Sequence, residues 1–279
     1  MTEAPTTDTT KTGTTQFLVA LDIDGTVLHE DGSLSLSVSD EVRRVVSLGH
    51  IVTLATGRSW ESTRPVLEDL ELTPQYVVCA NGALIMKRDE SADGGYERYF
   101  METFDPSEVL NLIQPHLSEG SYMVEYPDGF RKYTVGMQDW NLENAVEVPF
   151  EELVTSPVTR VVVVSPSHDE EEFLRIVDRI GLNQVSYAIG WTAWLDIAPK
   201  GVNKATALER VRDWLGLERS QMIAVGDGRN DVDMLGWAAV EGRGVAMGQA
   251  PEELLAVASE VTGTVTEDGL SQLLRSISG

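Results

Sequence analysis

Short apolar runs alternate with amphipathic stretches along most of the chain, and this alternation predicts an α/β protein with a parallel sheet. The first elements follow the order strand, helix, strand, helix, strand, which implies right-handed crossovers and a Rossmann-like core with helices on both faces. Their predicted ranges are 17–22, 37–48, 51–55, 59–70 and 76–79. The pattern resumes near the end of the chain with a helix at 204–215, a strand at 221–225, a helix at 230–238, a strand at 244–246 and a helix at 269–277.

Between these two stretches the strands become more closely spaced and fewer helices separate them. Strands are predicted at 83–87, 96–100, 121–126, 130–135, 158–164, 184–189 and 192–197, and helices at 106–117 and 168–180. Gly94-Gly95 and Pro127-Asp128-Gly129 have the composition of hairpin turns. We therefore predict an inserted α+β cap domain over 84–195 and a catalytic core formed by 17–83 and 196–279.

The first sixteen residues differ from the rest, because eight of them are threonine and no apolar periodicity is present. We expect residues 1–16 to be a disordered leader without a catalytic role. The leader lacks the basic start and apolar centre of a secretory signal. No apolar run in the chain approaches the ~20 residues needed to cross a bilayer. These features predict a cytoplasmic protein.

The net charge of −24 narrows the possible partners. So acidic a surface repels nucleic acid and anionic membranes, and neither is an expected partner. It also repels anionic substrates, so a phosphate site would have to supply its own local positive charge. Cys79 is the only cysteine, which excludes a disulfide within the chain, and its apolar strand predicts a packed core position.

Four polar segments follow predicted core strands or open a helix beside them. Because ligands collect at the carboxyl ends of strands in an open parallel sheet, all four are expected on one side of the molecule. Each alone is a weak signal, since aspartate and glycine after a strand are also ordinary turn formers. The segments are Asp22-Ile23-Asp24-Gly25-Thr26, Thr56-Gly57-Arg58, Gly201-Val202-Asn203-Lys204 and Gly226-Asp227-Gly228-Arg229-Asn230-Asp231.

The paired aspartates suit phosphoryl transfer. Alternate side chains of a strand share a face, so Asp22 and Asp24 would emerge together and need a cation or proton to offset their repulsion. Asp22 can attack phosphorus and hold the group as an acyl phosphate, while Asp24 moves protons to the leaving oxygen and from water. Mg²⁺ prefers hard oxygen ligands, for which the carboxylates of Asp22 and Asp227 and the backbone carbonyl of Asp24 are candidates.

Thr56 and the N–H groups beginning at Gly57 can bind phosphoryl oxygens, and a lysine ammonium can neutralise the charge on them. Lys204 would sit in the first turn of a helix capped by Asn203, where the helix dipole disfavours a cation unless it faces a phosphate. The alternative for Lys204 is a solvated surface lysine.

Three further residues have equally simple structural explanations. Arg58 either contacts substrate or pairs with a carboxylate that orders its loop. Asp231 is favourable in a first helical turn by dipole alone, and we interpret it as a supporting residue that orients Lys204 or a bound water. Asn230 either bridges water or phosphate or caps the helix.

Together these motifs resemble those of a haloacid dehalogenase-superfamily phosphatase of the Cof type, with a C2 cap between its second and third motifs. The four segments match the four motifs of that family in order, and Asn81-Gly82-Ala83 matches its entry to the cap. Gly244 to Ala250 and Asp268-Gly269 match its closing segment. Gln249 stands where relatives usually carry asparagine, and we expect it to lie outside the catalytic set.

The resemblance implies a Mg²⁺-dependent phosphatase in which Asp22 is the nucleophile, Asp24 the acid/base, Asp227 a metal ligand, and Thr56 and Lys204 phosphoryl contacts. The expected substrate is a small phosphomonoester, such as a sugar phosphate or related metabolite, and the expected assembly is a monomer or weak homodimer.

Alternatives remain open at this stage. One is phosphotransfer of the phosphomannomutase type, against which the acidic insert argues; another is a dedicated sucrose-phosphate or mannosylphosphoglycerate phosphatase. A binding protein without turnover would be expected to lack part of the catalytic set, and a receiver domain is about half this length. Within the insert, Glu125, Tyr126 and Arg131 could reach a sugar, although packing or surface roles are the expected ones.

Overall fold

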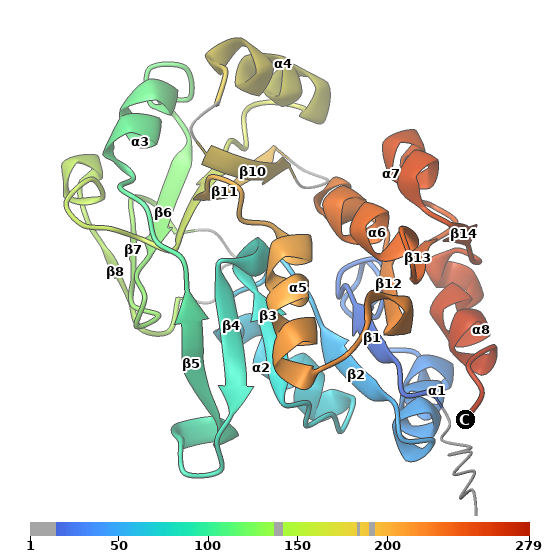
Figure 1. Cartoon of the computed structure of the whole chain (residues 1–279). Coiled ribbons are helices and arrows are strands. Elements are labelled where there is room, and N and C mark those ends of the chain that lie inside the picture. The colour runs from blue at the N-terminus through green and yellow to red at the C-terminus, as the bar shows by residue number, and fades with distance from the viewer. Residues whose placement is uncertain (1–14, 137–141, 183–184, 190–192) are drawn as a thin grey trace, which may run out of the picture.

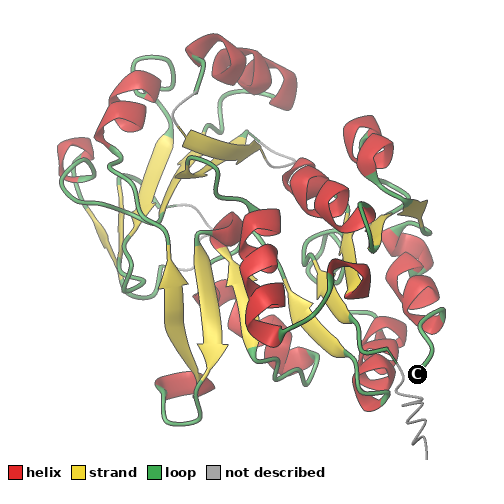
Figure 2. Cartoon of the chain, viewed as in Figure 1, coloured by secondary structure: helices red, strands yellow, loops and turns green. Residues whose placement is uncertain are grey.

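A five-stranded parallel sheet forms the core of the computed structural model, which describes residues 15–136, 142–182, 185–189 and 193–279 (Figures 1 and 2). The strand order is β14-β13-β12-β1-β2. The strands are β1 (Leu18–Leu21), β2 (Ile51–Leu54), β12 (Met222–Gly226), β13 (Arg243–Ala246) and β14 (Glu260–Val261). The predicted leader lies almost entirely outside the described residues.

Helices cover both faces of this sheet, which is why β1 is apolar throughout rather than alternating. Val19 and Leu21 pack with the helices of one face, whereas Leu18 and Ala20 pack with those of the other. All four residues are fully buried. The first face carries α1 (Leu36–Ser47), α2 (Trp60–Asp69) and α8 (Gly269–Arg275), and the second carries α5 (Lys204–Leu215), α6 (Val232–Ala239) and α7 (Glu252–Val257).

A second, antiparallel sheet of three strands continues from the core. β3 (Tyr76–Cys79) contacts the end of β2 through a parallel bridge between Ala55 and Val78. It then pairs with β4 (Leu84–Arg88), which pairs with β5 (Tyr96–Met101) across the predicted turn at Gly94-Gly95. The first two strands of the predicted insert therefore lie against the core, and Leu84 and Met86 are buried in its hydrophobic cluster.

The six-stranded sheet of the insert has the order β10-β11-β9-β6-β7-β8, and its strand β11 ends at Pro199, so residues 196–199, which were predicted as core, belong to the insert sheet. Two helices pack on one of its faces, where the α3 side chain of Leu110 and the α4 side chain of Phe173 meet the strand residues Val161 and Val163. The predicted α/β core with an inserted α+β part is confirmed. The elements are β6 (Ser121–Glu125), β7 (Arg131–Tyr133), β8 (Ala145–Glu147), β9 (Arg160–Val164), β10 (Val185–Ile189), β11 (Trp194–Pro199), α3 (Ser107–Ile113) and α4 (Glu170–Ile180).

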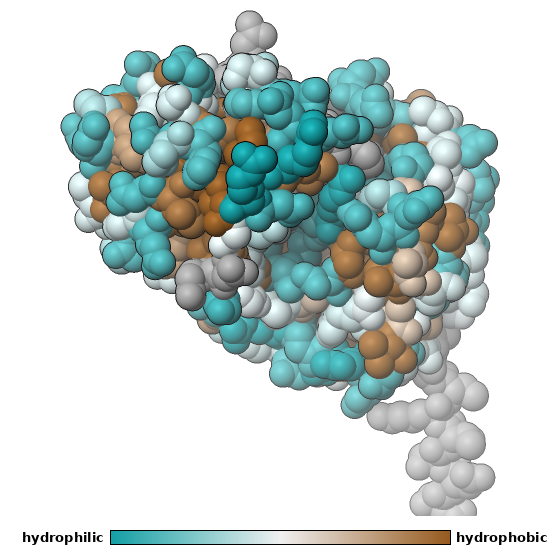
Figure 3. Space-filling view, turned by 90° about the horizontal axis from the view of Figure 1, so that it is seen from above, coloured by the Kyte–Doolittle hydropathy of each residue, from teal (hydrophilic) through white to brown (hydrophobic). Residues whose placement is uncertain are grey.

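Among the α-helices and β-strands of the described residues, three short ones were absent from the prediction: β8, α7 and β14. Each has six residues or fewer, too few to establish a hydrophobic period. The surface seen in Figure 3 carries hydrophilic side chains over most of its area, in keeping with the net charge, and its hydrophobic side chains gather in separate patches. Within the described ranges, no helix combines the length and apolar character needed to span a membrane.

Candidate active site

The four predicted segments meet at one edge of the parallel sheet. Asp22 follows β1, Asp227 follows β12, and Thr56 lies two residues beyond the end of β2. Lys204 opens α5 after Asn203, whose side chain caps that helix by accepting a hydrogen bond from the Thr206 N–H at 2.9 Å. The carboxyl ends of neighbouring parallel strands thus place these groups together, as the motif spacing predicted.

Lys204 lies between two carboxylates in the protein interior. Its Nζ is 2.6 Å from Asp22 Oδ1 and 2.7 Å from Asp231 Oδ1, and the Lys204 side chain has no exposed surface. The alternative of a solvated surface lysine is therefore wrong. Burial works against its charged form, but the two carboxylates outweigh that effect and hold the pKa of Lys204 above its usual value.

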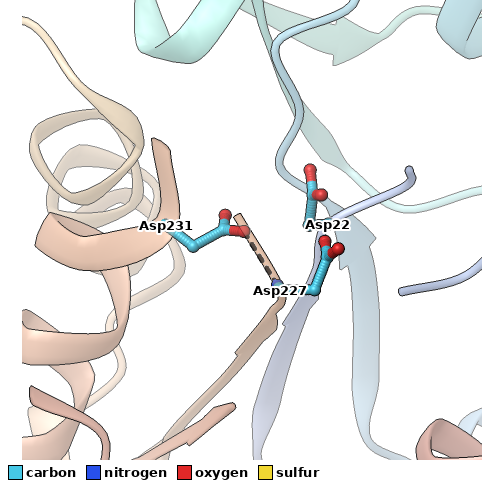
Figure 4. Close-up of side chains that lie close together, drawn as sticks. All are labelled: Asp22, Asp227 and Asp231. Atoms are coloured by element: carbon cyan, nitrogen blue, oxygen red, sulfur yellow. Dashed lines mark hydrogen bonds between the residues drawn. The ribbon is translucent and has the colours of Figure 1, made fainter. Parts of the chain in front are cut away.

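Three buried aspartates, Asp22, Asp227 and Asp231, place carboxylate oxygens within 4.8 Å of one another (Figure 4). Burial, opposed by Lys204 and reinforced by the neighbouring acids, raises the pKa of Asp22 well above its usual value. Burial and Asp231 raise the pKa of Asp227 to about 7. One ammonium does not balance three carboxylates, so the cluster fits a divalent cation bound through hard oxygen ligands.

The hydrogen bonds of Asp231 match its predicted supporting role. One oxygen accepts from Lys204, and the other accepts from the backbone N–H groups of Asp227 and Gly228, both at 3.0 Å. Asp231 therefore fixes both the ammonium and the loop that carries Asp227. The carboxylates of Asp22 and Asp227 remain the better placed to hold a cation.

Gly25 allows the loop after β1 to approach Asp227 closely. Its φ is +73°, and a Cβ at this position would lie 2.0 Å from Asp227 Oδ2. A side chain would both strain the backbone and collide with the carboxylate. Gly25 is therefore needed for the close packing of this loop against Asp227.

Arg58 pairs with Asp24, the predicted acid/base. Arg58 Nε donates to Asp24 Oδ2 at 2.9 Å, and Nη2 contacts the other oxygen. The Asp24 side chain remains 57% exposed, so this carboxylate is accessible where that of Asp22 is buried. Of the two roles considered for Arg58, the structure shows the pairing that orders the loop; contact with substrate remains a prediction.

Thr56 is fully buried, and its hydroxyl accepts a hydrogen bond from the Arg58 N–H at 3.0 Å. A hydroxyl that accepts in this way can still donate its own hydrogen. Binding of a phosphoryl oxygen by Thr56 and the turn through Gly57 stays a prediction.

Gln249, which is predicted to lie outside the catalytic set, contacts the loops that carry Gly25 and Asp227. Its Nε2 donates to the Gly25 carbonyl at 2.6 Å and lies 3.5 Å from Asp227 Oδ2, and its Oε1 accepts from the Val265 N–H at 3.0 Å. This contact could have been expected from the sequence, because Gln249 follows β13 closely and so lies at the same edge of the sheet as Asp227.

Asn81 is the second residue that the motif analysis did not assign to the site. Its side chain contacts Asn230 of the core and Asp196 of the insert. A pocket between insert and core is lined by these three residues and by Tyr187, Asn203 and Lys204.

Two of the three insert residues considered for sugar contact, Glu125 and Arg131, do not line this pocket. Glu125 and Arg131 are buried, with Glu125 Oε1 3.4 Å from Arg98 and Arg131 Nη2 3.5 Å from Glu61. Burial raises the pKa of Glu125. Together these groups form an ionic cluster that ties the β6–β7 hairpin to β5 and α2, which agrees with the expected packing role.

Comparisons with known proteins identify the family of the chain. A family model described as haloacid dehalogenase-like hydrolase matches residues 19–274. The 5-amino-6-(5-phospho-D-ribitylamino)uracil phosphatase YitU of Bacillus subtilis is 28% identical over 272 residues, which cover 94% of this chain and 97% of that protein. Phosphatase YwpJ of the same organism is 24% identical, over 92% of this chain and 98% of its own.

Solved structures share the fold. The phosphatase BT1666 from Bacteroides thetaiotaomicron aligns with a TM-score of 0.70 at 25% identity, over 94% of each chain. The subclass IIB sugar phosphatase BT4131 aligns with a TM-score of 0.77 at 24% identity, over 94% of this chain and 98% of that one.

Proposed function

The chain belongs to the haloacid dehalogenase-like hydrolases and is a phosphoric monoester hydrolase, and on that premise we propose that it cleaves small phosphomonoesters with Mg²⁺ through an aspartyl phosphate on Asp22. The observation that carries the proposal is the Asp22 carboxylate itself. It is buried directly after β1, paired with Lys204 and next to Asp227.

In the first step, an Asp22 oxygen attacks phosphorus, and the bond from phosphorus to the leaving oxygen breaks. Asp24 gives a proton to that oxygen, so that an alcohol departs. Lys204, the Thr56 hydroxyl and the N–H groups near Gly57 stabilise the phosphoryl oxygens. When bound by Asp22 and Asp227, Mg²⁺ supplies further charge neutralisation.

In the second step, Asp24 takes a proton from water as the water oxygen attacks phosphorus. The bond to Asp22 breaks, which regenerates the carboxylate and releases inorganic phosphate. The pairing with Arg58 holds Asp24 at the open side of the site for both proton transfers.

We place the substrate's leaving group in the pocket between insert and core, which Asn203 and Tyr187 line from either side. Polar side chains line most of this pocket, beside the apolar Ala198 and Val202, and they suit the hydroxyl groups of a sugar or polyol phosphate. The relative YitU acts on a phosphoribitylamino compound, which makes phosphorylated polyols and their nucleobase conjugates the first esters to assay. We further propose that the protein is cytoplasmic, that it is a monomer or weak homodimer, and that neither nucleic acid nor a membrane is its partner.

The test is phosphate release from a panel of metabolite phosphate esters with Mg²⁺. Asp22→Asn should abolish release, whereas Asp69→Asn, an exposed aspartate on α2, should leave it unchanged. Equal release by the wild type and Asp22→Asn would contradict the nucleophile assignment. Full activity in EDTA would contradict the metal assignment.

A further inference from the structure

Asn81 uses both ends of its side-chain amide to join the insert to the core. Its Nδ2 donates to Asp196 Oδ2 at 2.8 Å, and its Oδ1 accepts from Asn230 Nδ2 at 3.1 Å. Asp196 belongs to β11 of the insert, and Asn230 to the loop that carries Asp227. Because a carboxylate only accepts, the amide nitrogen must face Asp196, which leaves the amide oxygen for Asn230.

The insert end of this connection is rigid. Arg160 Nε and Nη2 donate to the two oxygens of Asp196 at 2.7 and 2.8 Å, and both side chains are buried. A two-point arginine–carboxylate pair fixes the carboxylate in position as well as in charge. The hydrogen bond from Asn81 therefore ends on a carboxylate, that of Asp196, which Arg160 holds in a fixed position on β11.

The core end reaches the phosphate-binding turn. The Asn81 N–H donates to the Thr56 carbonyl at 3.0 Å, and the Ala80 N–H donates to the Arg58 carbonyl at 2.8 Å. The Asn81 side chain also lies over Gly57, where a Cβ would come within 3.1 Å of its Nδ2. Ala80 and Asn81 together thus support the turn from Thr56 to Arg58, with Asn81 contacting Thr56 and Gly57.

The backbone at this point is strained. Ala80 and Asn81 have φ values of 50° and 49°, so two consecutive residues other than glycine occupy the left-handed region. Asparagine tolerates this conformation, but a buried alanine does not favour it. Such strain persists only where the surrounding contacts determine the conformation, as those on either side of Asn81 do.

We propose that Asn81 is a positioning residue that couples the placement of the insert to the geometry of the phosphate-binding turn and Asn230. The inference rests on the proposed function of this site. When the insert packs against the core, the hydrogen bond from Asn81 to Asp196 keeps the turn from Thr56 to Arg58 in its phosphate-binding conformation.

The test reverses the direction of this hydrogen bond. Asn81→Asp puts two carboxylates face to face, whereas Asn81→Asp combined with Asp196→Asn restores a donor–acceptor pair with its polarity exchanged. Asn144→Asp is the matched control, because Asn144 also has a positive φ, 55°, but is exposed and outside the site. Three quantities are measured: kcat/KM for the best ester, the Kd of inorganic phosphate by calorimetry with Mg²⁺, and the urea midpoint.

Asn81→Asp should lower kcat/KM and phosphate affinity by at least about tenfold, since small misplacements of binding groups are costly. The double variant should recover part of that loss, since Asp196→Asn leaves only one oxygen for Arg160, and Asn144→Asp should change neither kcat/KM nor phosphate affinity. Values for Asn81→Asp within twofold of the wild type would overturn the proposal, as would a folded double variant no better than Asn81→Asp. If Asn81→Asp does not fold, Asn81→Gly, which removes the side chain but tolerates the positive φ, decides by the same criteria. Failure of the proposed function is distinguishable, because it would leave Asp22→Asn active.

Discussion

Replacing Lys204 by methionine removes the one positive charge within the buried acid cluster while keeping most of the side-chain volume. The ammonium lies 2.6 Å from Asp22 and 2.7 Å from Asp231, and Asp227 is adjacent. Lys204→Met therefore leaves three buried carboxylates without their cation. We expect the variant to be inactive and also markedly less stable.

The loss of stability follows from the burial of the pair. Breaking a buried ion pair by removing one partner costs about 3–5 kcal/mol, whereas exposed pairs are worth about 0–1 kcal/mol. We expect a loss of about 4 kcal/mol at pH 8. For a chain of this size, about 2–4 °C of Tm corresponds to each kcal/mol, so Tm should fall by roughly 10 °C.

The loss should shrink at lower pH. Without the ammonium, the pKa values of Asp22 and Asp227 rise further above those of the unfolded chain, so the folded state takes up protons that the unfolded state does not. Groups with a raised pKa contribute stability at low pH that is lost as pH rises through the folded pKa. The deficit of Lys204→Met relative to the wild type should thus be largest at pH 8 and smaller at pH 5.

The assay is urea unfolding in EDTA at both pH values, because a divalent cation could replace the missing charge. Lys200→Met is the control, since Lys200 is exposed in the turn before the same helix. Lys204→Met with Asp231→Asn should recover part of the stability, because it removes one of the stranded charges. A Lys204→Met midpoint equal to that of Lys200→Met at pH 8 would refute the reasoning.

Three further results are expected. Gln249→Leu should raise the half-saturating Mg²⁺ concentration about tenfold in phosphate-release titrations, because an outer contact of Asp227 is lost; an unchanged value would contradict this role. Gly25→Ala should unfold at much lower urea than Gly32→Ala, which shares a positive φ of +79° but has no atom within 4 Å of its Cβ; equal midpoints would show no collision. Because the pKa of Asp227 is about 7, Mg²⁺ affinity by calorimetry should rise between pH 5 and 8 with proton release; an affinity independent of pH would exclude that coupling.

The core architecture could be predicted because its signals are local. Buried runs such as Val19 to Leu21 and the amphipathic pattern of α5 are each contained within a dozen residues. The order of strands and helices then places the loops after β1, β2 and β12 at one edge. The four motif segments could therefore be placed together before any contact was known.

The supporting contacts could not be predicted in this way, because they join residues that are distant in the sequence. Asn81 lies 115 residues from Asp196 and 149 from Asn230. Gln249 lies 224 residues from Gly25. Polar residues in loops carry no hydrophobic period, and their partners are set by how the insert and core pack. The motifs predicted which groups carry the chemistry, and the packing determined which groups hold them in place.

The central claim is that Asp22 carries the phosphoryl group between the two steps. The most direct measurement is a rapid acid quench of the enzyme with its best ester and Mg²⁺, followed by mass spectrometry of the digested chain. We predict one added HPO₃ group on the peptide that contains Asp22, labile to hydroxylamine as an acyl phosphate is. A phosphoryl group on another residue, or release of phosphate in the first turnover with no phosphorylated chain before it, would contradict the account.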